Sequence, residues 1–199
     1  MYGQALTLKK LAEQFASLPG IGRKSAWKLA FYILTLDKNR VKNFADTLLA
    51  ARQNICRCEI CQNLTDKNVC EICSNSARDC DIICVVEQPR DIILFEKSRS
   101  FNGLYHVLHG LISPLDGVGP DKLAIKELIK RVGGGAISEV ILATSPTVEG
   151  EATAMYISKL LKPFNITTSR LAYGVPVGGE LQYADEMTIS KAIENRSRL

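Results

Sequence analysis

The chain has 199 residues, of which 46% are hydrophobic, so it can bury one substantial core and carry one or two small modules beside it. This composition argues against a fibrous or disordered protein, and no run approaches the roughly 18 apolar residues of a membrane helix. The first residues form an amphipathic pattern instead of a signal peptide, so we expect a cytoplasmic protein without a membrane partner.

The net charge of +4 is unevenly distributed along the chain. Residues 1–54 contain nine Lys or Arg and three acids, whereas the remaining residues contain 16 basic and 18 acidic side chains. This asymmetry indicates a basic N-terminal module that meets a polyanion. The alternative is that these charges only keep the helices soluble.

Apolar residues recur at helical spacing between residues 7 and 55 and predict three helices. The break between the first two helices is the turn Leu-Pro-Gly-Ile-Gly at residues 18–22, and the second break lies at residues 37–40. We expect Ile21 and Leu29 to pack inward, between the helices of this hairpin.

The first turn is a candidate site for phosphate. Gly20 and Gly22 allow a tight turn whose backbone N–H groups point outward at the start of the next helix, which favours an anion. Lys24 and Lys28 are four residues apart and share one helix face, with Arg23 beside them. These residues predict a site that contacts the backbone of DNA and does not read the bases.

Other interpretations of this segment stay open. A helical hairpin with a glycine turn and solvated lysines has the same pattern. Trp27 either stacks on a base or belongs to the core or to an interface.

Residues 56–78 are rich in cysteine and contain few core-forming residues. The chain has seven cysteines, an odd number that disfavours a disulfide framework. Two identical Cys-x-x-Cys pairs are separated by eight residues, and their members are Cys58, Cys61, Cys70 and Cys73. Because zinc binds four thiolates as a tetrahedron, this spacing predicts one structural Zn²⁺ per chain.

The alternatives for the cysteines are reduced buried thiols or a redox pair. Cys56 is close enough in sequence to replace Cys58 as a ligand, although its spacing to Cys61 is less favourable. Cys84 lies within an apolar run and is expected in the core.

From Cys80 onward, short β-rich runs alternate with helical ones, which predicts an α/β fold with a mostly parallel sheet. We expect strands at residues 82–86, 105–108, 140–143 and 167–171, and helices near residues 89–97, 121–132, 150–162 and 186–195. A glycine- and proline-rich stretch at residues 174–179 separates the last strand from the last helix.

Acidic residues follow two of these strands, where α/β sheets place their sites. Glu87 ends the first strand, and Glu149 and Glu151 follow a later one. The arrangement resembles the Toprim domain of topoisomerases and primases, in which a glutamate and an Asp-x-Asp motif bind magnesium. Ser145 and Thr147 stand at the two aspartate positions here. We therefore expect no catalysis.

The three glutamates that remain have two interpretations of equal weight. They face a basic protein partner, or they are solvated surface acids.

Together with the hairpin and the cysteine pairs, the segments ICVVEQPRDI, HGLISPLDGVGPDKL, EVILATSPTVEGEATA and RLAYGVPVGGELQYADE resemble the RecR family along nearly the whole chain. The resemblance implies a helix-hairpin-helix DNA-binding module at residues 1–54, a four-cysteine zinc module at 55–78, a Toprim-like domain at 79–165 and a C-terminal strand and helix segment at 166–199.

The resemblance also implies a function. Members of the family are DNA-binding recombination mediators that form a ring-shaped tetramer around DNA. They act with RecO, and sometimes with RecF, in loading recombinase onto single-stranded DNA during repair. The DNA-contacting residues of the family carry over to Lys24 and Lys28, with Arg23 adjacent. The family commonly has a small residue or Gln at the position of Trp27 and Asn at that of Ser145.

Two rival functions remain. A Toprim-type nuclease or primase would require a divalent metal at Glu87 and Glu149. A protein-interaction scaffold would keep zinc and oligomerise but would show no salt-sensitive affinity for DNA.

Overall fold

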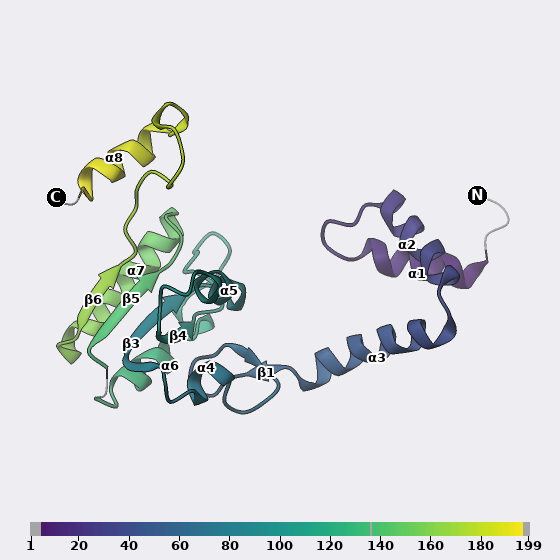
Figure 1. The fold of residues 1–199 in the computed structure, drawn as a ribbon, viewed down its shortest axis with the longest axis horizontal. Helices are drawn as coiled ribbons and strands as arrows, with labels where there is room; N and C mark the ends of the chain where they lie inside the picture. Colours follow the sequence, from purple (N-terminus) through teal and green to yellow (C-terminus); the bar gives the residue numbers. More distant parts are fainter. Residues whose placement is uncertain (1–4, 136, 197–199) are drawn as a thin grey trace. The chain divides into compact units, whose positions relative to one another are not determined.

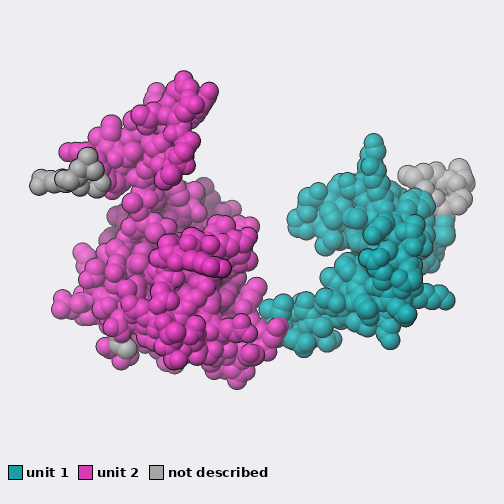
Figure 2. All heavy atoms as spheres, in the orientation of Figure 1, with its two compact units in different colours: residues 1–55 teal, residues 56–199 magenta. Residues whose placement is uncertain are grey.

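The computed structural model describes residues 5–135 and 137–196. These residues belong to two compact units, residues 1–55 and residues 56–199, which are coloured separately in Figure 2. Among the helices of the described residues, none is both long and apolar enough to cross a membrane.

The first unit contains the three expected helices, α1 (Leu6–Ala16), α2 (Arg23–Thr35) and α3 (Lys38–Asn54). The side chain of Asp37 begins α3 by accepting hydrogen bonds from the N–H groups of Asn39 (3.0 Å) and Arg40 (2.9 Å). None of the residues of α3 is buried, so its apolar side chains are at least partly exposed to solvent in a single copy of the chain.

The hairpin of α1 and α2 packs differently from our expectation. Its buried residues are Ala12, Ala26 and Ala30, whereas Leu29 is 37% exposed and Ile21 is only half-buried. Small side chains at the contact let the two helices approach closely, and this leaves no room between them for Leu29. The prediction that Leu29 packs inward is therefore wrong.

The second unit contains a four-stranded sheet (Figure 1). Its strands are β3 (Asp79–Val86), β4 (Gly103–Val107), β5 (Glu139–Ala143) and β6 (Thr167–Arg170), in the order β4-β3-β5-β6. Every neighbouring pair is parallel, which confirms the α/β fold. The strand β6 lies in the range 166–199, so the expected C-terminal segment contributes a strand to this sheet.

Alternate residues of β3 face two different helical layers. Ile83 and Val85 pack in one cluster with α6 (Ile125–Val132) and α7 (Val148–Leu161). Cys84 and Val86 pack in another cluster with α5 (Pro89–Ser98). This alternation is the period of a strand that is buried on both faces. The helix expected at 121–132 is a 3₁₀ turn at Pro120–Lys122 followed by α6.

Shorter elements flank the sheet. The cysteine-rich segment consists of the antiparallel strands β1 (Cys56–Arg57) and β2 (Leu64–Thr65) and the helix α4 (Glu71–Ser74). Near the end of the chain, the 3₁₀ helix Lys162–Phe164 precedes β6, the 3₁₀ helix Leu181–Tyr183 follows it, and α8 (Glu186–Glu194) comes last. The side chain of Asp185 caps α8 through the N–H of Thr188 at 2.9 Å.

Candidate functional site

The turn between α1 and α2 presents backbone donors at the start of a helix. Gly20 adopts a φ of +79°, which a side chain disfavours, and this conformation reverses the chain within a few residues. Gly22 is the N-cap of α2, and no side chain of the described residues caps the helix start. The first N–H groups of α2 are thus free to bind an anion, and the positive end of the helix dipole adds to the attraction.

Three cations lie beside this turn, at the start of α2. Arg23, Lys24 and Lys28 are all exposed on α2, and none of them forms an ion pair with an acid of the described residues. The first turn of α2 contains no acid, so Arg23 and Lys24 lie at the end of the helix that repels cations. A bound polyanion would relieve this repulsion, as expected at a phosphate site.

The two Cys-x-x-Cys pairs converge on one point. The four sulfur atoms of Cys58, Cys61, Cys70 and Cys73 all lie within 4.8 Å of one another. The Sγ atoms of Cys61 and Cys70 are 3.5 Å apart, close to the edge of about 3.8 Å that a tetrahedron with Zn–S bonds of about 2.3 Å requires. Among the described residues, this is the one group of three or more potential ligands with metal-site spacing.

The local backbone explains how the sulfurs are positioned. The N–H of Cys58 donates to the carbonyl of Asn63 at 2.7 Å, and Gln62, with a φ of +64°, turns the chain back between them. The N–H of Cys70 donates to the sulfur of Cys58 at 3.3 Å, which joins the second pair to the first. Cys56 is exposed, and its sulfur instead lies 3.4 Å from the carbonyl of Thr65, so it does not replace Cys58.

The electrostatics of the cluster favour a cation among the sulfurs. The hydrogen bond with Cys73, together with burial, raises the pKa of the Cys61 thiol, and burial raises that of Cys70 to about 11. Burial also raises the pKa of Cys58, but backbone N–H groups that donate to its sulfur lower it overall to about 7. The raised pKa values mean that it is costly to ionise several of these thiols together. A divalent ion among the sulfurs offsets that cost, so the residues present fit zinc.

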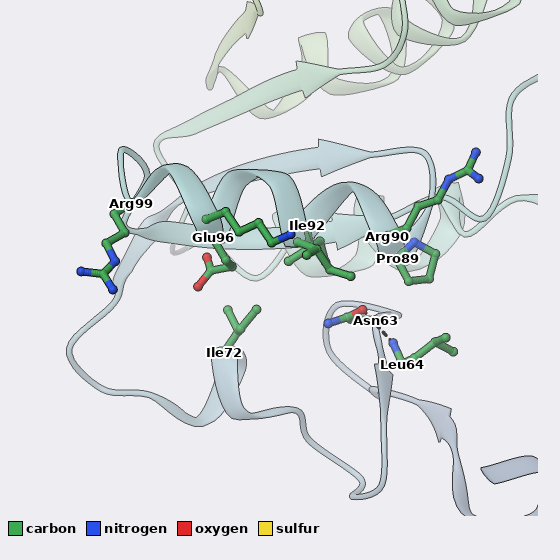
Figure 3. Close-up of a pocket in the computed structure, with 10 residues that line it drawn as sticks. Asn63, Leu64, Ile72, Pro89, Arg90, Ile92, Glu96 and Arg99 are labelled. Atoms are coloured by element: carbon green, nitrogen blue, oxygen red, sulfur yellow. Dashed lines mark hydrogen bonds between the residues drawn. The ribbon is translucent and has the colours of Figure 1, made fainter.

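The cysteine module is anchored to the α/β sheet. The N–H of Val107 donates to the carbonyl of Cys61 at 2.9 Å, and Nε2 of His109 lies 2.7 Å from the carbonyl of Gln62. Ile72 is half-buried and packs both against the cysteine cluster and against the core cluster that includes Ile92 of α5. Figure 3 shows Ile72 pointing toward α5 across a groove of 820 Å³. The cysteine module therefore forms one wall of this groove, through Asn63, Leu64 and Ile72.

At the carboxyl edge of the sheet, Glu87 is held by the backbone of the loop that follows β5. The carboxylate of Glu87 accepts a hydrogen bond from the N–H of Ser145. The hydroxyl of Thr147 caps α7 by accepting from the N–H of Gly150 at 3.1 Å. Ser145 and Thr147, at the two aspartate positions, thus stabilise the loop and the start of α7. Glu87, Glu149 and Glu151 are all described residues, and they do not form a group with metal-site spacing.

Arg170 lies at the same edge of the sheet and was missed by sequence reasoning. It is the last residue of β6, and its guanidinium contacts Glu151 at 3.0 Å, the hydroxyl of Thr144 at 3.2 Å and the hydroxyl of Tyr173. No spacing rule connects residues 151 and 170, because only the pairing of β5 with β6 places them together. The one available signal was a basic residue at the end of a predicted strand.

Known proteins are similar to this chain along nearly its whole length. Four family models match in order: the RecR helix-hairpin-helix at residues 8–52, the RecR zinc finger domain with four cysteines at 55–75, the Toprim domain at 81–172 and the RecR C-terminal region at 174–197. Two relatives from strains of Clostridium perfringens, both described as "Recombination protein RecR", are 56% identical over 192 residues, which is 96% of this chain and 96% of theirs. Together with the converging cysteines, the zinc-finger match establishes a structural zinc in this chain.

Proposed function

Because the chain belongs to the RecR family of recombination proteins, we propose that it is a DNA-binding recombination mediator and clamp in recombinational DNA repair. It assists RecO, and in some settings RecF, in loading recombinase onto single-stranded DNA. The observation that carries this proposal is the start of α2, which has no side-chain cap and whose Arg23, Lys24 and Lys28 pair with no acid of the described residues. It works in the cytoplasm, where thiols stay reduced and available to zinc.

The DNA contacts are made by the backbone of Gly20 and Gly22 and by the side chains of Arg23, Lys24 and Lys28. Contacts of this kind bind phosphates, so the hairpin accepts both double- and single-stranded DNA. Two lysines per chain give modest affinity alone, but several copies in a ring around DNA multiply it. We assign the modules to residues 1–54, 55–78, 79–165 and 166–199, and the zinc ligands to Cys58, Cys61, Cys70 and Cys73.

The assembly is a homotetrameric ring. Exposed apolar side chains support this proposal, since a monomer rarely leaves a large apolar surface open to water. On α3, Phe44, Leu48 and Leu49 are 49%, 58% and 60% exposed, and Phe44 and Leu48 share one helix face. A second copy of the chain would cover these side chains.

The Toprim-like domain serves as a partner surface and not as a catalyst. We assign Glu87, Glu149 and Glu151 to a basic partner protein. Hydroxyls at the two aspartate positions supply no charge for magnesium, which supports this assignment. The competing function is a magnesium-dependent nuclease or primase, which a search for nicking or primer synthesis with and without Mg²⁺ distinguishes.

The deciding experiment is DNA binding across a salt series, with the mass of the oligomer measured in parallel. In the variant Lys24→Ala/Lys28→Ala, affinity should fall, and the slope of log K against log salt should flatten by about 0.9 for each phosphate that is no longer neutralised. The matched control is Lys38→Ala/Lys42→Ala, which removes two charges at the same spacing from α3. An equal effect of both variants, or an unchanged slope, would contradict the assignment to the hairpin.

A further inference from the structure

A pair of aromatic rings, one exposed and one half-buried, lies on α2 next to the proposed DNA site. The ring centroids of Trp27 and Phe31 are 6.0 Å apart, and the ring planes meet at 35°. Phe31 is 53% exposed and Trp27 is half-buried, because the contact between the two helices is closed by alanines. The two rings are one helical turn apart and therefore form a continuous aromatic strip.

A hollow of 360 Å³ opens beside Trp27, between α1 and α2. Its apolar lining comes from Ala12, Ala16 and Ala26 together with Trp27. Lys9, Glu13 and Arg23 complete the lining. Lys9 and Glu13 form an exposed pair at 3.8 Å, which is weak in water, and Arg23 forms no ion pair with the described acids. The rim of the hollow is therefore positive.

The geometry of α2 places cations on both sides of the aromatic strip. A helix turns by about 100° per residue, so Arg23 lies about 40° to one side of Trp27 and Lys24 about 60° to the other. Phe31 lies about 60° from Lys28 in the same projection. Aromatic rings between cations are the arrangement with which proteins bind single-stranded nucleic acid, because bases stack on the rings while phosphates meet the charges.

We propose that Trp27 and the hollow beside it bind one unstacked base of single-stranded DNA, with Lys9 and Arg23 at neighbouring phosphates. This inference rests on the proposed function, since it assumes that the hairpin meets DNA. A duplex keeps its bases stacked inside and cannot supply such a base. The positive rim of the hollow, formed by Lys9 and Arg23, favours the phosphates of DNA over a second copy of this chain as the occupant.

The experiment uses the intrinsic fluorescence of the full chain, because Trp27 is its one tryptophan. A short oligothymidylate should quench the emission and protect Trp27 from acrylamide, whereas a duplex of equal length should do neither. Binding of both DNA forms is measured separately, by the anisotropy of a fluorescein label on the DNA. Stacking of one base predicts that Trp27→Ala weakens single-strand binding by about 5- to 150-fold and leaves duplex binding unchanged.

The variant Trp27→Phe should keep most of the single-strand affinity, and unchanged duplex binding in either variant shows that the hairpin is folded. Salt-sensitive DNA binding without quenching, or without loss in Trp27→Ala, overturns the base site but leaves the proposed function intact. No binding of either DNA form would reject the proposed function itself. Protection of Trp27 in the free protein, with a changed oligomer mass in Trp27→Ala, would mean that a second copy covers this surface, and the base site would be wrong.

Discussion

The guanidinium of Arg170, at the end of β6, lies 3.0 Å from the carboxylate of Glu151 in the first turn of α7. The same nitrogen lies 3.2 Å from the hydroxyl of Thr144, which in turn donates to the carbonyl of Gly150 at 2.9 Å. A cation of the chain itself thus balances one of the three glutamates at the carboxyl edge of the sheet. Of the proposed partner-binding acids, Glu151 already has a counter-ion.

We expect a small but measurable coupling between Arg170 and Glu151. Their side chains are 21% and 44% exposed, so water screens the pair and the coupling should be about 0.5–1 kcal/mol. A double-mutant cycle with Arg170→Ala and Glu151→Ala, followed by urea unfolding, measures it. Arg170→Ala alone should destabilise more than Glu151→Ala, because it also removes the contact with Thr144. Additive effects would show that the pair contributes nothing.

Gly150 should not tolerate a side chain. A Cβ atom at this position would lie 2.0 Å from the carbonyl oxygen of Ser145, so the loop that follows β5 would have to move. Helix propensity alone would make Gly150→Ala stabilising by about 1 kcal/mol, but we expect a net loss of about 1–3 kcal/mol from the clash. Thermal unfolding measures the change. The control is Gly174→Ala, where a Cβ meets nothing within 4 Å; equal stability of both variants would contradict the close contact.

At Gly22 we expect a loss of DNA binding with little loss of stability. Its φ is −75°, and a Cβ there would meet nothing within 4 Å, so Gly22→Ala fits the folded chain. The added methyl group would instead stand where a phosphate approaches the first N–H groups of α2. DNA affinity should fall several-fold in an anisotropy titration, while the unfolding temperature changes little. Unchanged affinity would mean that DNA does not approach this turn closely.

Zinc should be bound at one ion per chain and should be lost with any of its ligands. Serine variants of Cys58, Cys61, Cys70 and Cys73 should each release the metal, because a closed site needs four soft ligands. Cys56→Ser and Cys80→Ser are matched controls, since both residues are exposed and lie outside the cluster. Zinc content by atomic absorption checks the stoichiometry. Retention of zinc in Cys73→Ser together with its loss in Cys56→Ser would reassign the ligands.

Loss of stability in mild acid should be traceable in part to His106. Its side chain is fully buried with Nε2 2.7 Å from the carbonyl of Ala124, and burial lowers its pKa to about 4. Since the unfolded pKa is about 6.5, this group stabilises the fold fully above pH 6.5 and progressively less as the pH falls toward 4. The free energy of unfolding should drop by up to about 1.4 kcal/mol per pH unit more in the wild type than in His106→Gln. Identical slopes would show that His106 is not the titrating group.

The sequence alone determined the order of the elements and the metal centre. The strands, helices and glycine turn follow from local periodicity and backbone freedom, which neighbouring residues decide. The two Cys-x-x-Cys pairs predict a zinc site because a metal needs ligands of a given type at short spacing, which is also a local property of the sequence. The hairpin lysines and the acids that follow strands could also be located without coordinates.

Only the tertiary structure decided which side chains meet across the chain. The closeness of Arg170 to Glu151 depends on the pairing of β5 with β6, and the contact of Ile72 with α5 depends on how the zinc module packs on the sheet. The same reason accounts for Leu29, which periodicity placed inside the hairpin but which close packing of alanines leaves at the surface. Periodicity shows which face of a helix is apolar, whereas the size of the side chains that meet decides what that face can bury.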